Sequence, residues 1–262
     1  PSRNGLNYLK LAYESIIRYK HHHDVEILIL DDISDKDDTW EWCTGIMQSD
    51  TSFKAFKNTT STHYGISSGY SYLSKFATRE IICHWHNDMV MTDGTLDAVE
   101  RVLLESIDNK NVVCLTRIEP PIYTSAGLYD EKIVWQDAPV HIINWDWNKF
   151  LDYLPTAKQL WANTITEGHF APFFMSRNSY LELGLNDTIN FPKQAREDSD
   201  AAFRLVLAGF NTIQIPEFVY HFASRGNRRA DDVFKDNPEW IKIENDSVRN
   251  FIRKWQTMNL HD

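Results

Sequence analysis

Several features that would place this chain in a membrane or a secreted scaffold are scarce or missing. No apolar run approaches the roughly 20 residues that span a bilayer, and no signal-peptide-like segment opens the sequence. Cysteine is rare, and Cys43, Cys83 and Cys114 lack a Cys-x-x-Cys spacing. We therefore expect no membrane span, reduced and buried thiols, and a cytoplasmic location.

Positive charge is also in short supply. Lys and Arg total 27 against 37 Asp and Glu, a formal net charge of -10. Binding to a phosphate backbone or an anionic membrane requires clustered Lys and Arg, and the one obvious cluster is Arg225, Arg228 and Arg229. Nucleic-acid binding is therefore not expected.

Helical and strand-like patterns alternate through the first part of the chain. Helical spacing occupies residues 6–17, 66–78 and 95–106, and strand-like runs occupy 25–30, 80–85 and 112–118. This alternation predicts an α/β fold with a mostly parallel sheet flanked by helices. Ligands in such folds bind beyond the carboxyl ends of the strands. Asp31, Asp32 and Asp88 are expected at that edge, because each closely follows a predicted strand.

The alternation fails between residues 118 and about 174, where Pro, Gly, Trp, Tyr and His are abundant. Such a long insert in an α/β domain is more often a functional loop or subdomain than a passive connection. Its aromatic residues predict either a second small hydrophobic core or a binding platform. The sequence leaves both alternatives open.

Three carboxylates crowd the start of a predicted helix at residues 197–208. One carboxylate at a helix N-terminus is favoured by about 0.3–1 kcal/mol, but Glu197, Asp198 and Asp200 repel one another. The cluster is either a functional site or an over-charged cap, and Asp200 is expected to be only a capping carboxylate. By contrast, the run His21–His23 is interpreted as a solvated helix end, because consecutive residues do not share a helix face.

Five short motifs stand in a definite order along the chain. They are Pro-Ser-Arg-Asn at 1–4, Leu-Asp-Asp-Ile-Ser-Asp at 30–35, His-Asn-Asp at 86–88, Glu-Asp at 197–198, and a run at 215–221 that ends in His. In this order and spacing they resemble the GT-A glycosyltransferases of family 2, which are inverting enzymes that use nucleotide-sugar donors. The resemblance covers most of residues 1–100 and 168–225.

The resemblance implies roles for individual residues. Asp88 and His221 are implied as ligands of a divalent metal, with Mn²⁺ favoured over Mg²⁺ because Mg²⁺ prefers oxygen and water. Asp198 is implied as the general base and Glu197 as its neighbour. The residues implied to bind the donor are Pro1, Arg3, Asp31, Asp32, Tyr70, His86, Asn87 and Arg225.

The expected partners follow from the same resemblance. The donor is a nucleotide sugar, with UDP favoured and GDP or dTDP as alternatives. Aromatic faces pack against the apolar faces of sugar rings, so the insert is expected to hold a glycan or glycoconjugate acceptor. The residues expected to contact the acceptor are Trp145, Trp147, Trp161 and His169.

Two departures from the family pattern keep other functions open. His86 replaces the first Asp of the metal-binding Asp-x-Asp, and Gly69-Tyr70-Ser71 replaces Ala-Arg-Asn. A non-catalytic sugar-nucleotide or glycan-binding module that kept the fold is the first alternative. A nucleotidyltransferase is the second, although the Gly- and Lys-rich triphosphate loop it needs is not visible.

The resemblance also divides the chain. We expect one GT-A catalytic domain over 1–262, with a nucleotide-sugar-binding half at 1–117, an acceptor-binding and catalytic half at 118–225, and a C-terminal loop and helix at 226–262. A family member should have a buried first strand before Pro1, which is missing here. Residue 1 is therefore not expected to be the natural start.

Overall fold

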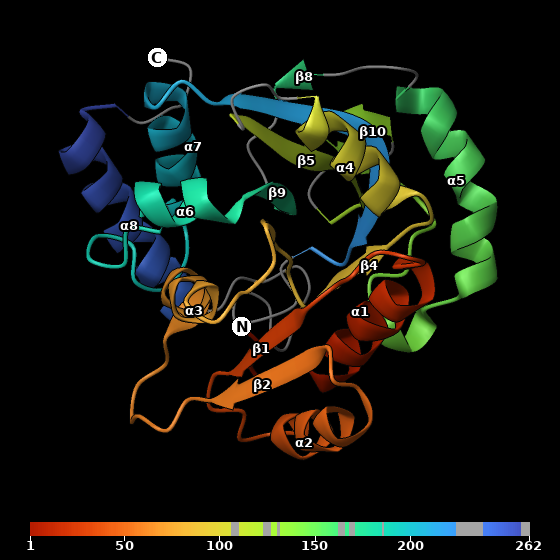
Figure 1. Ribbon diagram of the computed structural model, residues 1–262, viewed down its shortest axis with the longest axis horizontal. Helices are drawn as coiled ribbons and strands as arrows, with labels where there is room; N and C mark the ends of the chain where they lie inside the picture. Colours follow the sequence, from red (N-terminus) through yellow and green to blue (C-terminus); the bar gives the residue numbers. More distant parts are fainter. Residues whose placement is uncertain are drawn as a thin grey trace.

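Two β-sheets and their covering helices form the centre of the protein (Figure 1). The structure, a computed structural model, describes residues 1–105, 110–122, 127–129, 132–161, 166–167, 171–184, 186–223 and 238–257. Within these residues one sheet has two strands and the other has eight. The α/β prediction is confirmed.

The two-stranded sheet is built from the first part of the chain. Helix α1 (Leu6–Tyr19) leads to β1 (Ile27–Asp31), and α2 (Thr39–Ser49) connects β1 to its parallel partner β2 (Phe53–Lys57). Apolar side chains of α1, α2 and both strands share one core. Beside β1, Ser2 forms a parallel bridge with Asp31, donating its N–H to the Leu30 carbonyl at 2.8 Å.

The larger sheet has mixed rather than mostly parallel pairing. Its central order is β3 (Ile81–His84), β9 (Phe173–Ser176), β5 (Asn111–Glu119), β10 (Asn211–His221) and β4 (Met89–Met91), with β6 (Gly127–Tyr129), β7 (Lys132–Val134) and β8 (Thr166–Glu167) at its margins. β5 is parallel to β10 and β7, while β3–β9, β5–β9 and β4–β10 are antiparallel. The prediction differs because β9, which follows the aromatic insert, enters between β3 and β5.

Alternate side chains of β5 explain how helices cover both faces of this sheet. Val112 and Cys114 pack with residues of α6 (Arg177–Leu183) and α7 (Glu197–Leu207). Val113 and Leu115 pack instead with residues of α4 (Thr95–Leu104). Helix α3 (Gly65–Ser74) lies near β1. Figure 1 shows α6, α7 and α8 (Pro238–Trp255) gathered at one side of the molecule.

The aromatic insert contains more regular structure than the sequence indicated. A short 3-10 helix η1 (Ile142–Asn144) precedes α5 (Trp147–Trp161), which lies opposite the α6–α8 group (Figure 1). Trp145 and Trp161 belong to, or pack against, a hydrophobic core that includes Phe150, Tyr220 and Phe222. The aromatic side chains of the insert thus share a core with Leu11 of α1 and Val90 of β4.

Asp200 does more than the predicted capping. Its side chain is 1% exposed and accepts a hydrogen bond from Trp255 Nε1 at 2.8 Å, while Lys254 Nζ lies 2.6 Å from the same oxygen. Arg204 Nε donates to the other oxygen at 3.0 Å. A buried carboxylate needs such partners, and here they fasten α8 to α7. The prediction that Asp200 is only a cap is wrong.

Two further findings concern the predicted thiols and the question of a membrane span. The three cysteines, all in described segments, are free thiols, and two of them are buried. Among the described residues, no helix combines the length and apolarity needed to cross a bilayer.

Candidate active site

A cleft of about 430 Å³ collects most of the predicted site residues. Its walls come from the chain start, the start of α3, the turn after β3, the end of β10, the first turn of α7, and α8. The predicted residues that line it are Pro1, Arg3, Asp32, Tyr70, His86, Asn87, Asp88, Glu197, Asp198 and His221. Segments more than 200 residues apart in sequence thus meet at one place.

His86, Asp88 and His221 form a compact group of metal-ligand side chains. Their ligand atoms all lie within 4.8 Å of one another, and Asp88 Oδ1 is 3.5 Å from His221 Nε2. Burial lowers the pKa of His86 to about 4, against the opposing effect of Asp88, so its imidazole is neutral and has a lone pair to offer. The arrangement fits a divalent cation with mixed nitrogen and oxygen ligands.

Glu119 orients His221 and was missed by the sequence prediction. Its Oε1 lies 2.7 Å from His221 Nδ1, which leaves Nε2 facing Asp88. Burial would raise the pKa of Glu119, but Arg117, His221 and Lys132 outweigh it and hold that pKa well below the usual range. A carboxylate on the second nitrogen of a ligating histidine is a common way to fix the ring and increase its basicity.

The acidic end of α7 is aimed at the cleft by the segment that precedes it. The carbonyls of Pro192 and Lys193 accept hydrogen bonds from the amides of Ser68 and Ser67 at 3.2 and 3.0 Å, which fixes this segment on α3. Ala195 and Arg196 follow with positive φ angles of 68° and 66°. Non-glycine residues rarely adopt this conformation, and such strain often accompanies functional sites.

Glu197 and Asp198 differ in their surroundings. Asp198 is exposed at the cleft, and its Oδ1 accepts a hydrogen bond from the Ser199 amide at 2.7 Å. Glu197 is half-buried, and its Oε2 has no hydrogen-bond partner within the described part of the chain. Burial raises the pKa of Glu197 to about 8, and the neighbouring Asp198 adds to the rise. Two adjacent carboxyls thus have distinct environments, as acid–base sites require.

The paired aspartates after β1 serve the fold as well as the cleft. Asp32 accepts hydrogen bonds from the amides of Tyr64 and Gly65 at 2.9 and 2.8 Å, which supports the start of α3. Asp31 is fully buried, and its Oδ1 accepts from the Ser34 amide at 3.1 Å. Asp31 does not line the cleft, so the structure brings together only one of the pair with the other site residues.

Gly69 explains one departure from the family pattern. A Cβ atom at this position would lie 2.7 Å from Pro1 Cβ, closer than real Cβ atoms pack. The next residue, Tyr70, stacks on His84 with ring centroids 4.0 Å apart and donates its hydroxyl to the Trp85 carbonyl at 2.9 Å. Gly69 therefore leaves room for Pro1, and Tyr70 holds the end of β3 and the residue that leads to His86.

Three predicted acceptor residues, Trp145, Trp147 and Trp161, do not line the cleft. They pack in or against a hydrophobic core, and Trp147 also contacts Arg18, whose Cζ is 4.9 Å from the ring centroid. His169 and Arg225 lie outside the described residues.

Helix α8 contributes two cleft residues that the sequence did not indicate. Trp240 and Glu244 line the wall near α7. They belong to the predicted C-terminal loop and helix at 226–262, within which α8 begins at Pro238. Its position depends on the partners of Asp200 and on Ser247 Oγ, which donates to the Gln194 carbonyl at 3.1 Å, and no local motif encodes these long-range contacts.

Comparisons with known proteins identify the fold and the family of this chain. The structure is similar to a crystal structure of GalNAc-T7 with UDP, GalNAc and Mn²⁺, with a TM-score of 0.58 and 16% identity over 82% of this chain. The chain spans 40% of the length of that neighbour, and at this identity the likeness establishes the fold. A search of curated proteins found no match. The model of glycosyl transferase family 2 matches residues 1–181, and the chain therefore belongs to this family.

Proposed function

We propose that the protein is a metal-dependent, inverting glycosyltransferase that moves a sugar from a nucleotide-sugar donor to an acceptor hydroxyl. The observation that carries the proposal is the juxtaposition, in one cleft, of the His86–Asp88–His221 group and the exposed carboxylate of Asp198. A departing diphosphate requires stabilisation of negative charge, whereas an attacking hydroxyl requires a base that accepts its proton. The histidine–aspartate group suits the first role and the Asp198 carboxylate suits the second.

The leaving-group side is supplied by the metal-ligand residues. His86, Asp88 and His221 would hold a divalent cation, which when bound neutralises the charge that develops on the departing diphosphate. The two histidines favour Mn²⁺ over Mg²⁺. Arg3, whose Nε is buried without a described partner, lines the same wall and supplies a guanidinium suited to phosphate oxygens.

The acceptor side is supplied by α7. Asp198 accepts the proton of the attacking hydroxyl as the general base, a role typically worth about 10²–10⁴ in rate. Glu197, protonated over a wide pH range because of its raised pKa, donates rather than accepts a hydrogen bond beside it. A single displacement with one base inverts the anomeric configuration.

The donor and acceptor classes follow from chemistry and likeness. GalNAc-T7, the similar structure, holds UDP, GalNAc and Mn²⁺, which supports a UDP-sugar as the first donor to test, followed by GDP- and dTDP-sugars. Trp240, a buried residue that lines the cleft, offers an aromatic ring against which a sugar of a glycan acceptor can pack.

A two-part experiment tests this function. Thermal denaturation with Mn²⁺ and each nucleotide sugar identifies the donor, because a ligand that binds the folded state raises its Tm. Transfer is then measured for Asp198→Asn, where we expect donor binding to persist and turnover to fall about 10²–10⁴-fold. NMR of the product should show the inverted anomer.

The control is Asp246→Asn, an exposed carboxylate on α8 that lies outside the cleft lining. It should turn over like the wild type. Turnover of Asp198→Asn within tenfold of wild type would remove Asp198 as the base. Donor binding without any turnover in the wild type would instead favour the non-catalytic binding module.

A further inference from the structure

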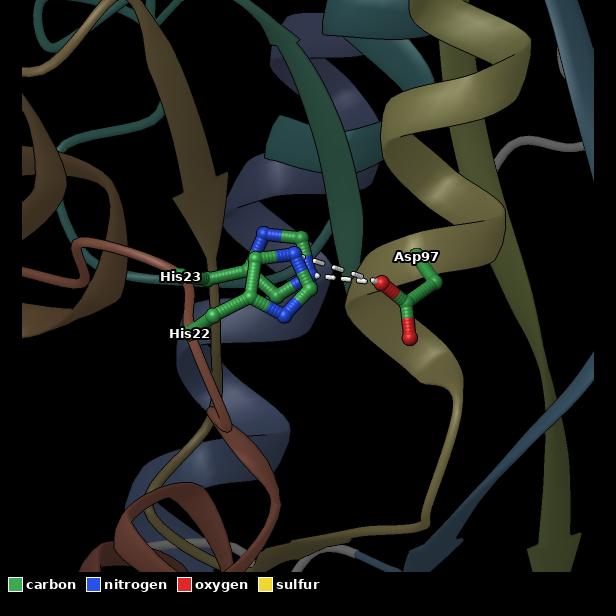
Figure 2. A group of neighbouring side chains, drawn as sticks. All are labelled: His22, His23 and Asp97. Carbon is green, nitrogen blue, oxygen red and sulfur yellow. Dashed lines mark hydrogen bonds and ion pairs between the residues drawn. The ribbon is translucent and has the colours of Figure 1, made fainter.

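A second group of metal-ligand side chains lies on the surface, outside the cleft. His22 and His23, in the turn after α1, face Asp97 in the first turn of α4 (Figure 2). Helix α1 ends at Tyr19, so the helix-face rule used for the sequence prediction does not apply to this turn. Both imidazoles therefore reach the same carboxylate, and the interpretation as a merely solvated helix end does not describe them.

The distances suit a single small cation. Asp97 Oδ1 is 3.0 Å from His23 Nε2 and 3.9 Å from His22 Nε2, and all three ligand atoms lie within 4.8 Å of one another. A tetrahedral ion with ligands at about 2.0–2.2 Å separates neighbouring ligand atoms by about 3.3 Å. The two observed distances bracket that value. The stacked rings, with centroids 4.3 Å apart, direct both nitrogens to the same side.

The surrounding residues resemble the outer support of a metal site. Glu100, one helical turn after Asp97, places its Oε2 3.8 Å from His23 Nδ1, the nitrogen that does not face Asp97. Ligating histidines usually donate this second N–H to a carboxylate. Next to them, His21 Nε2 lies 2.6 Å from Asp93 Oδ1, which anchors the turn to the segment before α4.

The location gives a bound ion a structural role. The turn leads into β1 of the two-stranded sheet, whereas α4 packs on the large sheet. A cavity of about 540 Å³ separates the two sheets here, and His23 and Glu100 lie in its lining. A cation shared by the turn and α4 would cross-link the two sheets at the rim of this cavity.

We propose that His22, His23 and Asp97 bind one transition-metal cation of the Zn²⁺ class, that Glu100 orients His23, and that the ion clips the turn after α1 to α4. Two imidazoles select Zn²⁺, Ni²⁺ or Cu²⁺ over Mg²⁺ and Ca²⁺. Water completes the coordination, because His22 is 75% exposed. The site is separate from the cleft and does not take part in the transfer reaction.

The test counts bound Zn²⁺ by equilibrium dialysis of the intact protein. The cleft group also accepts Zn²⁺, so the measured quantity is the difference between wild type and variant. Asp97→Asn and the double variant His22→Ala/His23→Ala should each bind one equivalent less. Co²⁺ should give the wild type a tetrahedral d–d absorption that weakens in both variants.

The matched control is His141→Ala, an exposed histidine that is not part of the group. It should bind as much Zn²⁺ as the wild type. His22 and Asp97 are exposed and the His23 side chain is 15% exposed, and circular dichroism of the metal-free variants checks that they fold. Equal Zn²⁺ stoichiometry in wild type, Asp97→Asn and the double variant would overturn the proposal.

Discussion

Within the described part of the chain, two groups each combine two histidines with one aspartate, and they differ in burial and in how they are supported. His86, Asp88 and His221 are half-buried or buried at the ends of β-strands, and Glu119 holds one of them through a 2.7 Å contact. His22, His23 and Asp97 come from a turn and a helix, and their supporting carboxylate, Glu100, is 3.8 Å away.

The difference shows what turns a set of ligands into a reactive site. In the cleft, the ligands lie at or near strand ends, and the Asp198 carboxylate lines the same cavity. In the surface group, His22 and Asp97 are exposed, and the carboxylate beside them, Glu100, faces His23. The first group is therefore suited to chemistry and the second to cross-linking, although the residue types are the same.

Replacing the aspartate of each group gives the largest expected contrast. Asp88→Asn should reduce glycosyl transfer about 10²–10³-fold, because removing one fixed electrostatic partner of the transition state has costs of this size. It should also abolish the Mn²⁺-dependent increase in Tm. Asp97→Asn, measured in parallel with the same donor, should transfer at the wild-type rate. Equal losses in the two variants would show that both groups serve one function.

The supporting carboxylates provide a second, smaller contrast. Glu119→Gln should weaken Mn²⁺ binding about 10–100-fold, the usual cost of losing an outer-shell partner of a ligating histidine. Glu100→Gln should leave Mn²⁺ binding in the cleft unchanged. Calorimetric titration with Mn²⁺ measures both. If Glu119→Gln bound Mn²⁺ like the wild type, His221 would not depend on Glu119 for its orientation.

Much of the cleft could be predicted because its residues follow strands. Asp88 and His221 stand at the ends of β3 and β10, where the general rule for α/β sheets places ligand sites. Glu119 ends β5 and satisfies the same rule, so the sequence held a signal for it. Its role became visible only in the pairing of β5 with β10, in which Ile118 lies opposite Tyr220.

The remaining features depend on contacts between distant segments. Trp240 enters the cleft because Asp200 and Gln194 hold α8, and Trp145, Trp147 and Trp161 of the insert pack in or against a hydrophobic core. The family model ends at residue 181, before Glu197 and His221. Their place in the site therefore rests on geometry, which makes α7 the region where mutagenesis is most informative.

Burial of Glu197 gives the cleft a pH-dependent cost in stability. Glu197 in the folded protein has a pKa of about 8, against an ordinary value of 4.5. Between these two pH values the unfolded chain releases this proton and the folded protein keeps it. The free energy of unfolding therefore falls as pH rises through this window, and the loss is complete above the folded pKa.

Glu197→Gln removes this titration while keeping the shape of the neutral side chain. Metal-free wild type and variant should have equal stability near pH 4, where Glu197 is protonated in both states of the wild type. At pH 8 the variant should be more stable, by an amount on the order of a few kcal/mol, since one pKa unit corresponds to about 1.4 kcal/mol. Urea denaturation at both pH values measures the difference. A constant offset between wild type and Glu197→Gln at both pH values would mean that the raised pKa does not control stability, and that the burial of this carboxyl is compensated by a partner in the folded protein.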